Sequence, residues 1–598
     1  MKKTNLVEEV QLDFNRRREE RKSLEAKWLL NLNFLEGNQY SELNSNLELV
    51  DYGKKYYWEN REVYNHIAPI IESRLAKFTR VNLAVNVRPA SGEDSDVQGA
   101  RLATKLIEST FLDNNFFSLS AKANLWAEIT GTVFYKVYWE EENGGQAKIS
   151  VCPSYEIYPD SLEQNKMENL RSIIHARAYP VRQIEDIWGV KVEPEEISLL
   201  SSNTFTESTK FNLSGFRSDR QSKEGYAMVI ERYDAPSKDY PDGRFIIVSG
   251  DKLIYDGALP YVNGENGRRV FPFIKQVSLE SPCSFFGTSV IERLIPVQRA
   301  YNAVKNRKHE FMSRLSSGVI AVEEGSVDLD SLEEEGLAPG KVITYRQGYN
   351  PPLLMSAGTV PQEFRDEEDR LLAEFKIISG VSDSAQISSA GEATVSGYAL
   401  SLLLEQDYMR LSVTTESIRG AIKEVARHIL RLFREFSEGE RIVRIAGEGG
   451  AVELKAFKGS ELKSDDIVLE SDSTMVETPA TRKSMVLELL KYGLLGDENG
   501  IISNRNRAKI VEMLGFGNWE SARNDEEVHL KKCALENQEL ATGKTILPDE
   551  LDDHDVHILE HTISFVSGRD TLSDQAKKAI KEHVRKHKIL AKITLSSK

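Results

Sequence analysis

The longest helical pattern in the chain covers residues 398–436, and it constrains the fold more than any other feature. Apolar residues recur along one face of this segment at helical spacing: Leu411, Ile418, Ile422, Val425, Ile429, Leu432 and Phe436. At about 1.5 Å per residue, such a helix is roughly 58 Å long, which is unusual for a helix in an isolated globular domain.

A second pair of helices precedes it, predicted at residues 287–318 and 359–379. The first carries an apolar stripe of about 25 residues with basic residues around it. The stripe is Val290, Leu294, Val297, Tyr301, Val304, Phe311 and Leu315. Pro296 is expected to kink this helix or to begin a new segment. The second helix has five acidic residues near its N-terminal end, where the helix dipole favours negative charge.

The residues between these helices differ in character. Residues 319–358 combine short apolar runs with the acidic stretch "EEGSVDLDSLEEEG", which predicts a small α/β insertion. Residues 380–397 read "GVSDSAQISSAGEATVSG", and eleven of these eighteen residues are Gly, Ser or Ala. A stretch this long without secondary structure is either a flexible linker or a functional loop.

The remaining segments predict an α+β protein that is mainly α, with more than one domain. Helices are expected at residues 5–36, 64–80 and 92–117, and residues 477–598 read as mostly helical. Strands are expected at residues 131–140, 148–153, 226–235 and 243–257, with a hairpin at 441–457.

Charge and targeting signals limit the function classes. The net charge is −16, which argues against a protein that coats DNA nonspecifically. The N-terminus is charged throughout, and no segment reaches the length of an apolar spanning helix, so a cytosolic location is expected. The three cysteines, Cys152, Cys283 and Cys533, have no metal-ligand or redox spacing and are expected to be small buried residues.

Few motifs suggest catalysis. "ATGKTIL" at residues 541–547 has the GKT of a phosphate-binding loop, but Gln538 stands where the motif needs glycine, so a turn is expected. No nucleophile or zinc-protease motif occurs in the sequence, and no cofactor is predicted. The basic tail, residues 571–598, is interpreted as a solvated helix face, with a DNA-facing role as the alternative.

One histidine cluster stands out, "LDDHDVHILEHTISF". His554, His557 and His561 are three and four residues apart, so they share one face of a helix and could bind zinc or manganese. The alternative is a capped helix that packs polar residues at a subunit contact. Without a second set of ligands in view, the structural interpretation is favoured, and no metal is predicted. A metal-dependent hydrolase or nuclease built on these histidines is the rival function, and a helical scaffold oligomer without a DNA role is another.

The order of these segments resembles bacteriophage portal proteins, the head-to-tail connectors of tailed phages, of the podophage type. The similar stretch is "FPFIKQVSLESPCSFFGTSVIERLIPVQRAYNAVKNRKHEFM", with a Pro-x-Gln-x-x-x-Asn pattern at Pro296, Gln298 and Asn302. "ISGVSDSAQ" followed by "SGYALSLLLEQ" resembles the family's Gly-rich link into its long helix. "DDHDVHILEHTISF" is similar to a C-terminal motif of podophage-type members, which further favours the structural interpretation of the histidines.

The resemblance implies a non-enzymatic homo-oligomer, a ring of about twelve copies at one capsid vertex of the virion, assembled in the host cytoplasm. Double-stranded DNA would pass through its channel during genome packaging and ejection. The implied partners are the terminase large subunit, tail adaptor or head-completion proteins, the scaffolding protein and the major capsid protein.

The resemblance also assigns the parts of the chain. Residues 287–318 and 359–379 correspond to the stem, 319–358 to the clip, 380–397 to the tunnel loop, 1–286 with 398–476 to the wing, and 477–598 to the crown. The residues expected in the DNA channel at the tunnel loop are Asp383, Gln386, Ser388, Ser389 and Glu392. Weak DNA contacts are expected from the stem residues Lys305, Arg307, Lys308 and Arg314. The clip residues expected to dock partners, or else to form a solvated face, are Glu323, Glu324, Asp328, Asp330, Glu333, Glu334 and Glu335.

Overall fold

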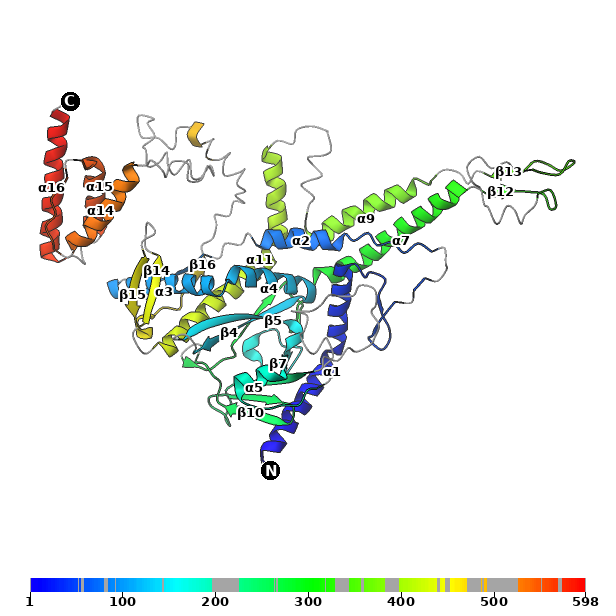
Figure 1. The fold of residues 1–598 in the computed structure, drawn as a ribbon, viewed down its shortest axis with the longest axis horizontal. Helices are drawn as coiled ribbons and strands as arrows, with labels where there is room; N and C mark the ends of the chain where they lie inside the picture. The colour runs from blue at the N-terminus through cyan, green and yellow to red at the C-terminus, as the bar shows by residue number, and fades with distance from the viewer. Residues whose placement is uncertain are drawn as a thin grey trace. The chain divides into compact units, whose positions relative to one another are not determined.

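The structure is a computed structural model of the 598-residue chain (Figure 1). Its described residues form two compact units, one of residues 1–89, 99–441 and 457–471 and one of residues 90–98, 442–456 and 472–598. We refer to them as the large and the small unit. The structure describes every residue except 1, 52, 55–58, 80–83, 92, 142–144, 196–224, 263, 265–266, 318, 328–343, 356–359, 382–396, 438–440, 447–451, 470–485, 487–488, 492–524, 542, 550, 568–572 and 597–598.

The described chain is mixed α+β and mainly helical, as the sequence predicts. The helices are α1 Lys2–Glu36, α2 Ile67–Phe78, α3 Asp94–Asp113, α4 Phe116–Thr130, α5 Val181–Trp188, α7 Val290–Ser317, α9 Glu363–Ser379, α11 Gly397–Phe436, α14 Asp525–Ala541, α15 His554–Ser567 and α16 Asp574–Ser596. The strands are β1 Glu42–Leu43, β2 Leu49–Val50, β3 Val85–Val87, β4 Thr132–Glu140, β5 Gln146–Pro153, β6 Ile157–Pro159, β7 Ser172–Pro180, β8 Tyr226–Asp234, β9 Arg244–Ser249, β10 Lys252–Gly257, β11 Phe273–Val277, β12 Val319–Ala321, β13 Leu353–Met355, β14 Arg441–Ala446, β15 Val452–Phe457 and β16 Ile467–Leu469.

A five-stranded antiparallel sheet in the order β10-β9-β8-β7-β6 lies in the large unit. Because successive side chains of a strand point to opposite faces, β8 buries both of its faces against different helices. Met228 and Ile230 pack with Val10 and Phe14 of α1 on one face. The alternate residues of β8 pack with Ile184 of α5 on the other face.

A three-stranded antiparallel sheet, in the order β11-β4-β5, supports the long helix α11. The hydroxyl of Thr414 on α11 donates to the carbonyl of Ser278 just after β11, at 2.9 Å. At the other end of the helix, Trp139 of β4 stacks on Phe436 with ring centroids 5.2 Å apart. The sheet therefore holds the C-terminal half of α11 along its length.

Two glycines allow the chain to pass close to itself where α7 begins. A side chain on Gly131 would come within 2.3 Å of the carbonyl oxygen of Gly287, and one on Gly287 within 2.7 Å of the carbonyl oxygen of Gly131. Gly131 also has a φ of +81°, a region that favours glycine. This close approach brings the end of α4 against the residues that lead into α7.

The helices α1, α2, α4, α7 and α9 share one apolar core. Its buried residues include Phe34, Ile67, Ile291, Leu294 and Phe375. In Figure 1, α7 and α9 run side by side, with the β12–β13 hairpin beyond their far ends. The predicted helices at 287–318, 359–379 and 398–436 are thus present as α7, α9 and α11, and Pro296 lies inside α7.

Three expectations from the sequence need correction. The single helix expected at residues 92–117 is two helices, because Asn115 adopts the left-handed conformation between α3 and α4. The helix expected from residue 64 begins at Ile67, where Asn65 Oδ1 accepts hydrogen bonds from the Ile67 and Ala68 amides. Cys283 is exposed, whereas Cys152 and Cys533 are buried as expected.

In the small unit, α14, α15 and α16 pack against one another as a three-helix bundle. One apolar cluster of the bundle contains Leu540, Ala579 and Ile580. The turn expected at residues 541–547 follows the end of α14, with Gly543 at a φ of +87°, and no strand precedes it in the described residues. Among the described helices, none has the length and apolar character needed to cross a membrane.

Candidate functional site

The paired helices α7 and α9 are joined by aromatic contacts and by charge. Tyr301 and Phe375 contact each other at a ring-centroid distance of 6.1 Å. Farther along the pair, Glu368 of α9 accepts hydrogen bonds from Lys305 and Lys308 of α7, with Nζ–Oε distances of 3.1 Å. Glu368 is buried, and although burial opposes its charged form, the bonds from both lysines lower the pKa of its carboxyl group.

This pairing changes the interpretation of the basic residues expected to meet DNA. Lys305 and Lys308 both bond to Glu368, so one carboxylate offsets one of their two positive charges inside the helix pair. Arg307 is exposed. The side chain of Arg314 lies outside the described residues.

A ladder of polar side chains on α7 holds the extended segment 59–66. Gln298, Asn302 and Asn306 are buried, and each accepts a hydrogen bond from a backbone amide of that segment. The amides are those of His66 at 3.0 Å, Tyr64 at 3.1 Å and Glu62 at 3.1 Å. Glu310 continues the series by accepting from the Asn60 amide at 3.1 Å.

The spacing of this ladder follows from backbone geometry. Residues four apart on a helix are separated by about 6 Å along its axis, and residues two apart in an extended chain by roughly 6.6 Å. A helix with polar residues every fourth position therefore matches alternate amides of an extended chain. This match supplies a physical reason for the Gln298 and Asn302 positions of the Pro-x-Gln-x-x-x-Asn pattern.

A buried ion pair fixes the root of residues 380–397. Arg74 of α2 forms two hydrogen bonds with Glu128 of α4, at 2.7 and 3.2 Å, and both side chains are buried. Arg74 also donates to the carbonyl of Ser379, the last residue of α9, at 2.7 Å. Gly380 then ends the helix with a φ of +70°, next to Arg410 of α11. The chain thus leaves α9 from a rigid anchor.

Most of the residues expected to line the channel or to dock partners cannot be placed. The loop residues lie outside the described residues: Asp383, Gln386, Ser388, Ser389 and Glu392. Among the acidic residues of the insertion, Glu323 and Glu324 are exposed, and Glu323 accepts a hydrogen bond from the Asn350 amide at 3.3 Å. The others lie outside the described residues: Asp328, Asp330, Glu333, Glu334 and Glu335.

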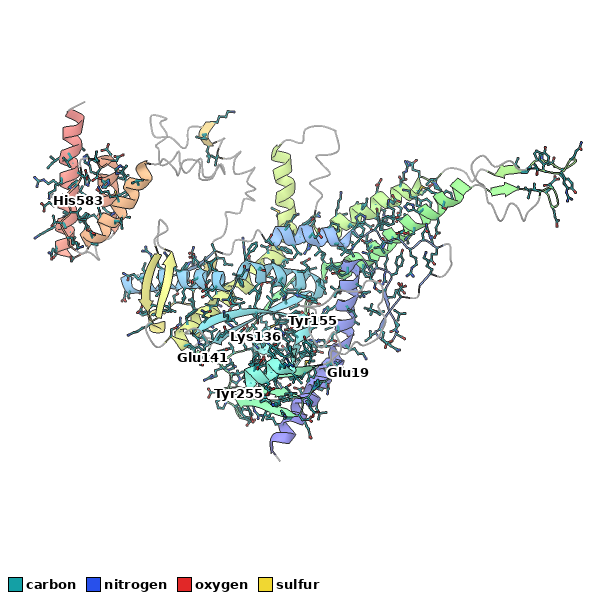
Figure 2. All side chains as sticks on the ribbon, in the orientation of Figure 1. Glu19, Lys136, Glu141, Tyr155, Tyr255 and His583 are labelled. Carbon is teal, nitrogen blue, oxygen red and sulfur yellow. The ribbon has the colours of Figure 1, made fainter. Side chains whose placement is uncertain are left out.

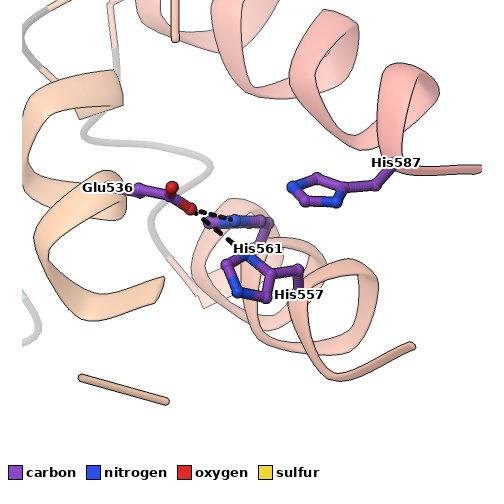
Figure 3. A group of neighbouring side chains, drawn as sticks. All are labelled: Glu536, His557, His561 and His587. Atoms are coloured by element: carbon purple, nitrogen blue, oxygen red, sulfur yellow. Dashed lines mark ion pairs between the residues drawn. The ribbon is translucent and has the colours of Figure 1, made fainter. Parts of the chain in front are cut away.

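The predicted histidine face is buried inside the C-terminal bundle. His554, His557 and His561 all lie on α15, as expected from their spacing. The structure brings His557 and His561 together with Glu536 of α14 and His587 of α16 (Figure 3). His554 is outside this group, and its Nδ1 lies 3.0 Å from Nδ1 of His587.

Glu536, His583 and His587 were missed in the sequence analysis. His583 and His587 are also four residues apart, so the i,i+4 histidine pair of α15 recurs on α16. This repeated spacing was the available signal, but the basic residues of the tail obscured it. Burial and the neighbouring histidines lower the pKa of His587 to about 3.

A second cluster of potential metal ligands, Cys152, Glu156 and His175, belongs to a complete charge network in the large unit. His175 lies 3.2 Å from Glu156 and 3.0 Å from Glu231, so each of its ring nitrogens faces a carboxylate. Lys136 also contacts Glu231, at 2.5 Å. Figure 2 shows Lys136 among the side chains of the large unit's sheets. Two cations and two carboxylates balance here without a metal.

Comparison with known proteins adds to this geometry. A search of curated proteins found no match. The model of the phage P22-like portal protein family matches residues 14–485, more than three quarters of the chain. The matched range contains the α7–α9 pair, the α7 ladder and α11, and it ends before the bundle of α14, α15 and α16. The chain therefore belongs to the phage P22-like portal protein family, whose role is that of a structural, non-enzymatic portal in a phage capsid.

Proposed function

We propose that this chain forms a ring around an axial channel, through which double-stranded DNA is packaged into the capsid and later ejected. The observation that carries the proposal is the order of elements inside the family match. Helix α7, the β12–β13 hairpin, helix α9 and the segment 380–397 lead into the 40-residue helix α11. In this proposal they act as stem, clip, second stem helix, tunnel loop and wing helix, and residues 477–598 form the crown.

Exposed apolar side chains near the stem support assembly into a ring. Ile377 on α9 is 68% exposed, and Met409 and Val413 on α11 are each 67% exposed in the single chain. Met409 and Val413 are four residues apart, so they lie on one face of α11. Burying such side chains against a neighbouring copy would remove apolar surface from water and favour association.

The charge of the stem favours passage of DNA without tight binding. Glu368 offsets one of the two charges of Lys305 and Lys308, while Glu363, Asp366 and Asp369 of α9 are exposed. Phosphate binding depends on free Lys and Arg, and an acidic surface repels the DNA backbone. We infer that Arg307 supplies the weak stem contact and that the two paired lysines mainly join α7 to α9.

The anchor at Arg74 supports a role for residues 380–397 as a channel element carried on a fixed base. Arg74 holds the carboxyl end of α9, and Gly380 sits beside Arg410 of α11. The point at which the chain leaves α9 is thereby fixed. The acidic clip, which includes Glu323 and Glu324, is proposed to dock basic surfaces of the terminase large subunit and of tail adaptor proteins.

Electron microscopy of the purified full-length chain tests the ring. Negative-stain images should show rings with an axial hole, and a monodisperse monomer or a filament would contradict the proposal. Val413→Asp should weaken assembly by placing a charge in the subunit contact. Ser73→Asp introduces the same charge at an exposed position of α2, outside the face of Met409 and Val413, and serves as the matched control.

Deletion of residues 384–394 tests the loop. Rings should still form, because the deletion leaves the Arg74 anchor and α11 intact, but phage carrying the variant should package or retain less DNA. Normal packaging and retention in the deletion variant would remove the loop from the mechanism.

The two rival interpretations lose their support. A non-enzymatic family leaves no place for a hydrolase or nuclease built on His554, His557 and His561. A scaffold without a DNA role is disfavoured by the portal family match. Rings that neither package nor retain DNA would restore the scaffold interpretation.

A further inference from the structure

The centre of the C-terminal bundle is polar where a small bundle would normally be apolar. Glu536, His557, His561, His583 and His587 are all buried, and His557, His561 and His587 are 0% exposed. They come from all three helices, with Glu536 on α14, two histidines on α15 and two on α16. A small domain has little apolar area to stabilise it, so a polar centre requires a compensating interaction.

The distances between these polar atoms match a shared cation. Oε2 of Glu536 lies 3.2 Å from Nδ1 of His557 and 3.3 Å from Nε2 of His561. Two atoms that are each about 2.0–2.1 Å from a tetrahedral zinc ion are roughly 3.3 Å apart. With His587 included, one ligand atom from each of the four residues lies within 4.8 Å of all the others. Small side-chain rotations would bring all four onto one ion (Figure 3).

Several of these atoms have no hydrogen-bond partner in the described residues. They are Oε2 of Glu536, both ring nitrogens of His557 and Nε2 of His561. Buried polar atoms of native proteins are almost always paired with protein groups or water, or bound to an ion. Three of these atoms, Oε2 of Glu536, Nδ1 of His557 and Nε2 of His561, face one another, which indicates a missing common partner.

The hydrogen bonds around the cluster orient two of the histidines. Nδ1 of His583 lies 3.0 Å from the carbonyl oxygen of Ile546, which can only accept, so this nitrogen carries the proton. Nδ1 of His561 lies 2.7 Å from the amide oxygen of Asn537 and also donates. In the neutral ring, Nε2 of each histidine then carries a lone pair. That of His561 lies 3.3 Å from Oε2 of Glu536, whereas that of His583 lies 3.6 Å from Oε2 of Glu536 and 3.1 Å from Nε2 of His587.

Adding protons to the histidines does not satisfy all of the facing nitrogen and oxygen atoms at once. Opposed lone pairs on nitrogen and carboxylate oxygen repel unless a positive charge lies between them. One proton satisfies one contact, and further protonation places like charges on rings whose centroids are 4.6–5.7 Å apart, away from water. A divalent ion supplies two positive charges at one point and accepts all of these lone pairs together.

We propose that Glu536, His557, His561 and His587 bind a structural zinc ion that joins the three helices of the bundle. Three imidazoles and one carboxylate suit zinc better than magnesium or calcium, which prefer oxygen ligands. Four protein ligands fill a tetrahedral site and leave no position for a reactive water, in keeping with a non-enzymatic family. Asn537 positions His561 from behind, as outer partners of metal-bound histidines commonly do.

Metal content and coordination of the untagged full-length protein test the site. The protein is produced with zinc in the medium, and loosely bound metal is then removed. Elemental mass spectrometry should find about one zinc ion per chain. Zinc X-ray absorption should show nitrogen neighbours at about 2.0–2.1 Å and the outer-shell scattering of histidine rings. Less than about a tenth of an ion per chain in the wild-type protein would overturn the proposal.

Matched histidine variants locate the ion. The double substitution His557→Ala and His561→Ala should lower bound zinc at least tenfold. His309→Ala removes an exposed histidine of α7 and should leave the zinc content unchanged. Equal zinc in the double variant and the wild type would contradict the site. If the double variant does not fold, the absorption spectrum of the wild type decides, because a site without histidine scattering would also contradict it.

This inference is independent of the proposed channel function. Zinc content is measured on the purified chain, and ring formation is measured by microscopy. Rings without zinc would refute only the metal site, and zinc without rings would refute only the assembly.

Discussion

The two compact units differ in how the charged groups compared below are buried. In the large unit, buried charges meet partners of opposite charge within the chain: Arg74 with Glu128, Arg21 with Glu25, and His175 with Glu156 and Glu231. In the described part of the bundle, Glu536 meets histidines whose facing nitrogens have no hydrogen-bond partner. The difference teaches that a buried ionisable group need not indicate function. A complete network stabilises a fold, whereas an incomplete one indicates a missing ligand.

Removing zinc should have the largest effect and would test the comparison directly. A structural zinc site contributes apparent binding energies of about 10–16 kcal/mol, most of it to folding. A strong chelator should therefore unfold the bundle, which hydrogen exchange would detect as lost protection in α14, α15 and α16. Protection in strands β7, β8 and β9 should not change. If these three helices keep their protection after complete chelation, the bundle is stable without a metal, as the large unit is, and the comparison fails.

Breaking the buried pair Arg74–Glu128 should be the largest single-residue effect in the large unit. Arg74→Met leaves Glu128 as a buried charge without a partner and should cost about 3–5 kcal/mol in the free energy of unfolding. The double variant Arg74→Met with Glu128→Leu should lose clearly less than the sum of the two single losses. Urea unfolding followed by tryptophan fluorescence measures all three variants. Additive losses would show that the two charges do not depend on each other.

Arg21 is the clearest buried cation of the charged N-terminal helix. Its guanidinium donates to the carbonyls of Ser154 at 3.0 Å and Tyr155 at 2.7 Å, and it lies 3.6 Å from the ring centroid of Tyr158. Arg21→Ala should therefore cost about 3 kcal/mol. Arg16→Ala, on the exposed side of the same helix, should cost less than about 0.5 kcal/mol. Similar losses of stability for the two variants in urea unfolding would contradict the special contribution of the buried Arg21.

The His175 network should make the stability of the large unit depend on pH. Burial and Lys136 oppose the charged ring, but Cys152 and Glu231 outweigh them and raise the pKa of His175 well above its usual value. Burial opposes the charged form of Glu231 as well, yet Lys136 and His175 lower the pKa of Glu231 well below its usual range.

The sign of each contribution follows from these directions. The stabilisation from His175 is complete below its unfolded pKa of about 6.5 and is lost as pH rises through the raised folded value. That from Glu231 is present above about pH 4.3 and is lost as pH falls toward the lowered folded value. His175→Gln should thus cost about 1–3 kcal/mol near pH 5.5 and less at pH 9. A loss that is the same at both pH values in urea unfolding would contradict a charged His175.

The α7 ladder should show the smallest of these effects. Asn302→Ala removes the acceptor of the Tyr64 amide and the donor to Oε1 of Gln39, which should cost about 1–2 kcal/mol. Glu310→Gln keeps an acceptor for the Asn60 amide and should change stability by less than about 0.5 kcal/mol. Thermal unfolding measures the stability of both variants. An equal loss in the two would show that the ladder's hydrogen bonds do not hold segment 59–66 against α7.

Much of the secondary structure could be predicted from the sequence because its signals are local. Apolar residues at helical spacing predicted α7, α9 and α11, and runs of strand-forming residues predicted β4, β8 and β9. The break at Asn115 was missed because a single left-handed residue leaves no mark on hydrophobic periodicity. Segment 59–66 was missed because its hydrogen bonds go to side chains of a distant helix.

The candidate sites were less predictable, since they depend on contacts between distant residues. Lys305 and Lys308 looked free for DNA until Glu368, sixty or more residues away, proved to bond to both of them. Asp383 and the other loop residues remain predictions.

By itself, the sequence determined the helices, the strands and the order of segments that belongs to the portal family, because periodicity and turn residues act over a few positions. Only the tertiary structure decided which buried groups meet. It placed Arg21, from a highly charged segment, against the ring of Tyr158, and it brought Glu536 to histidines on two other helices. The physical reason is that a side chain's protonation, pairing and ligands depend on neighbours in space, and packing selects those neighbours across large separations in the chain.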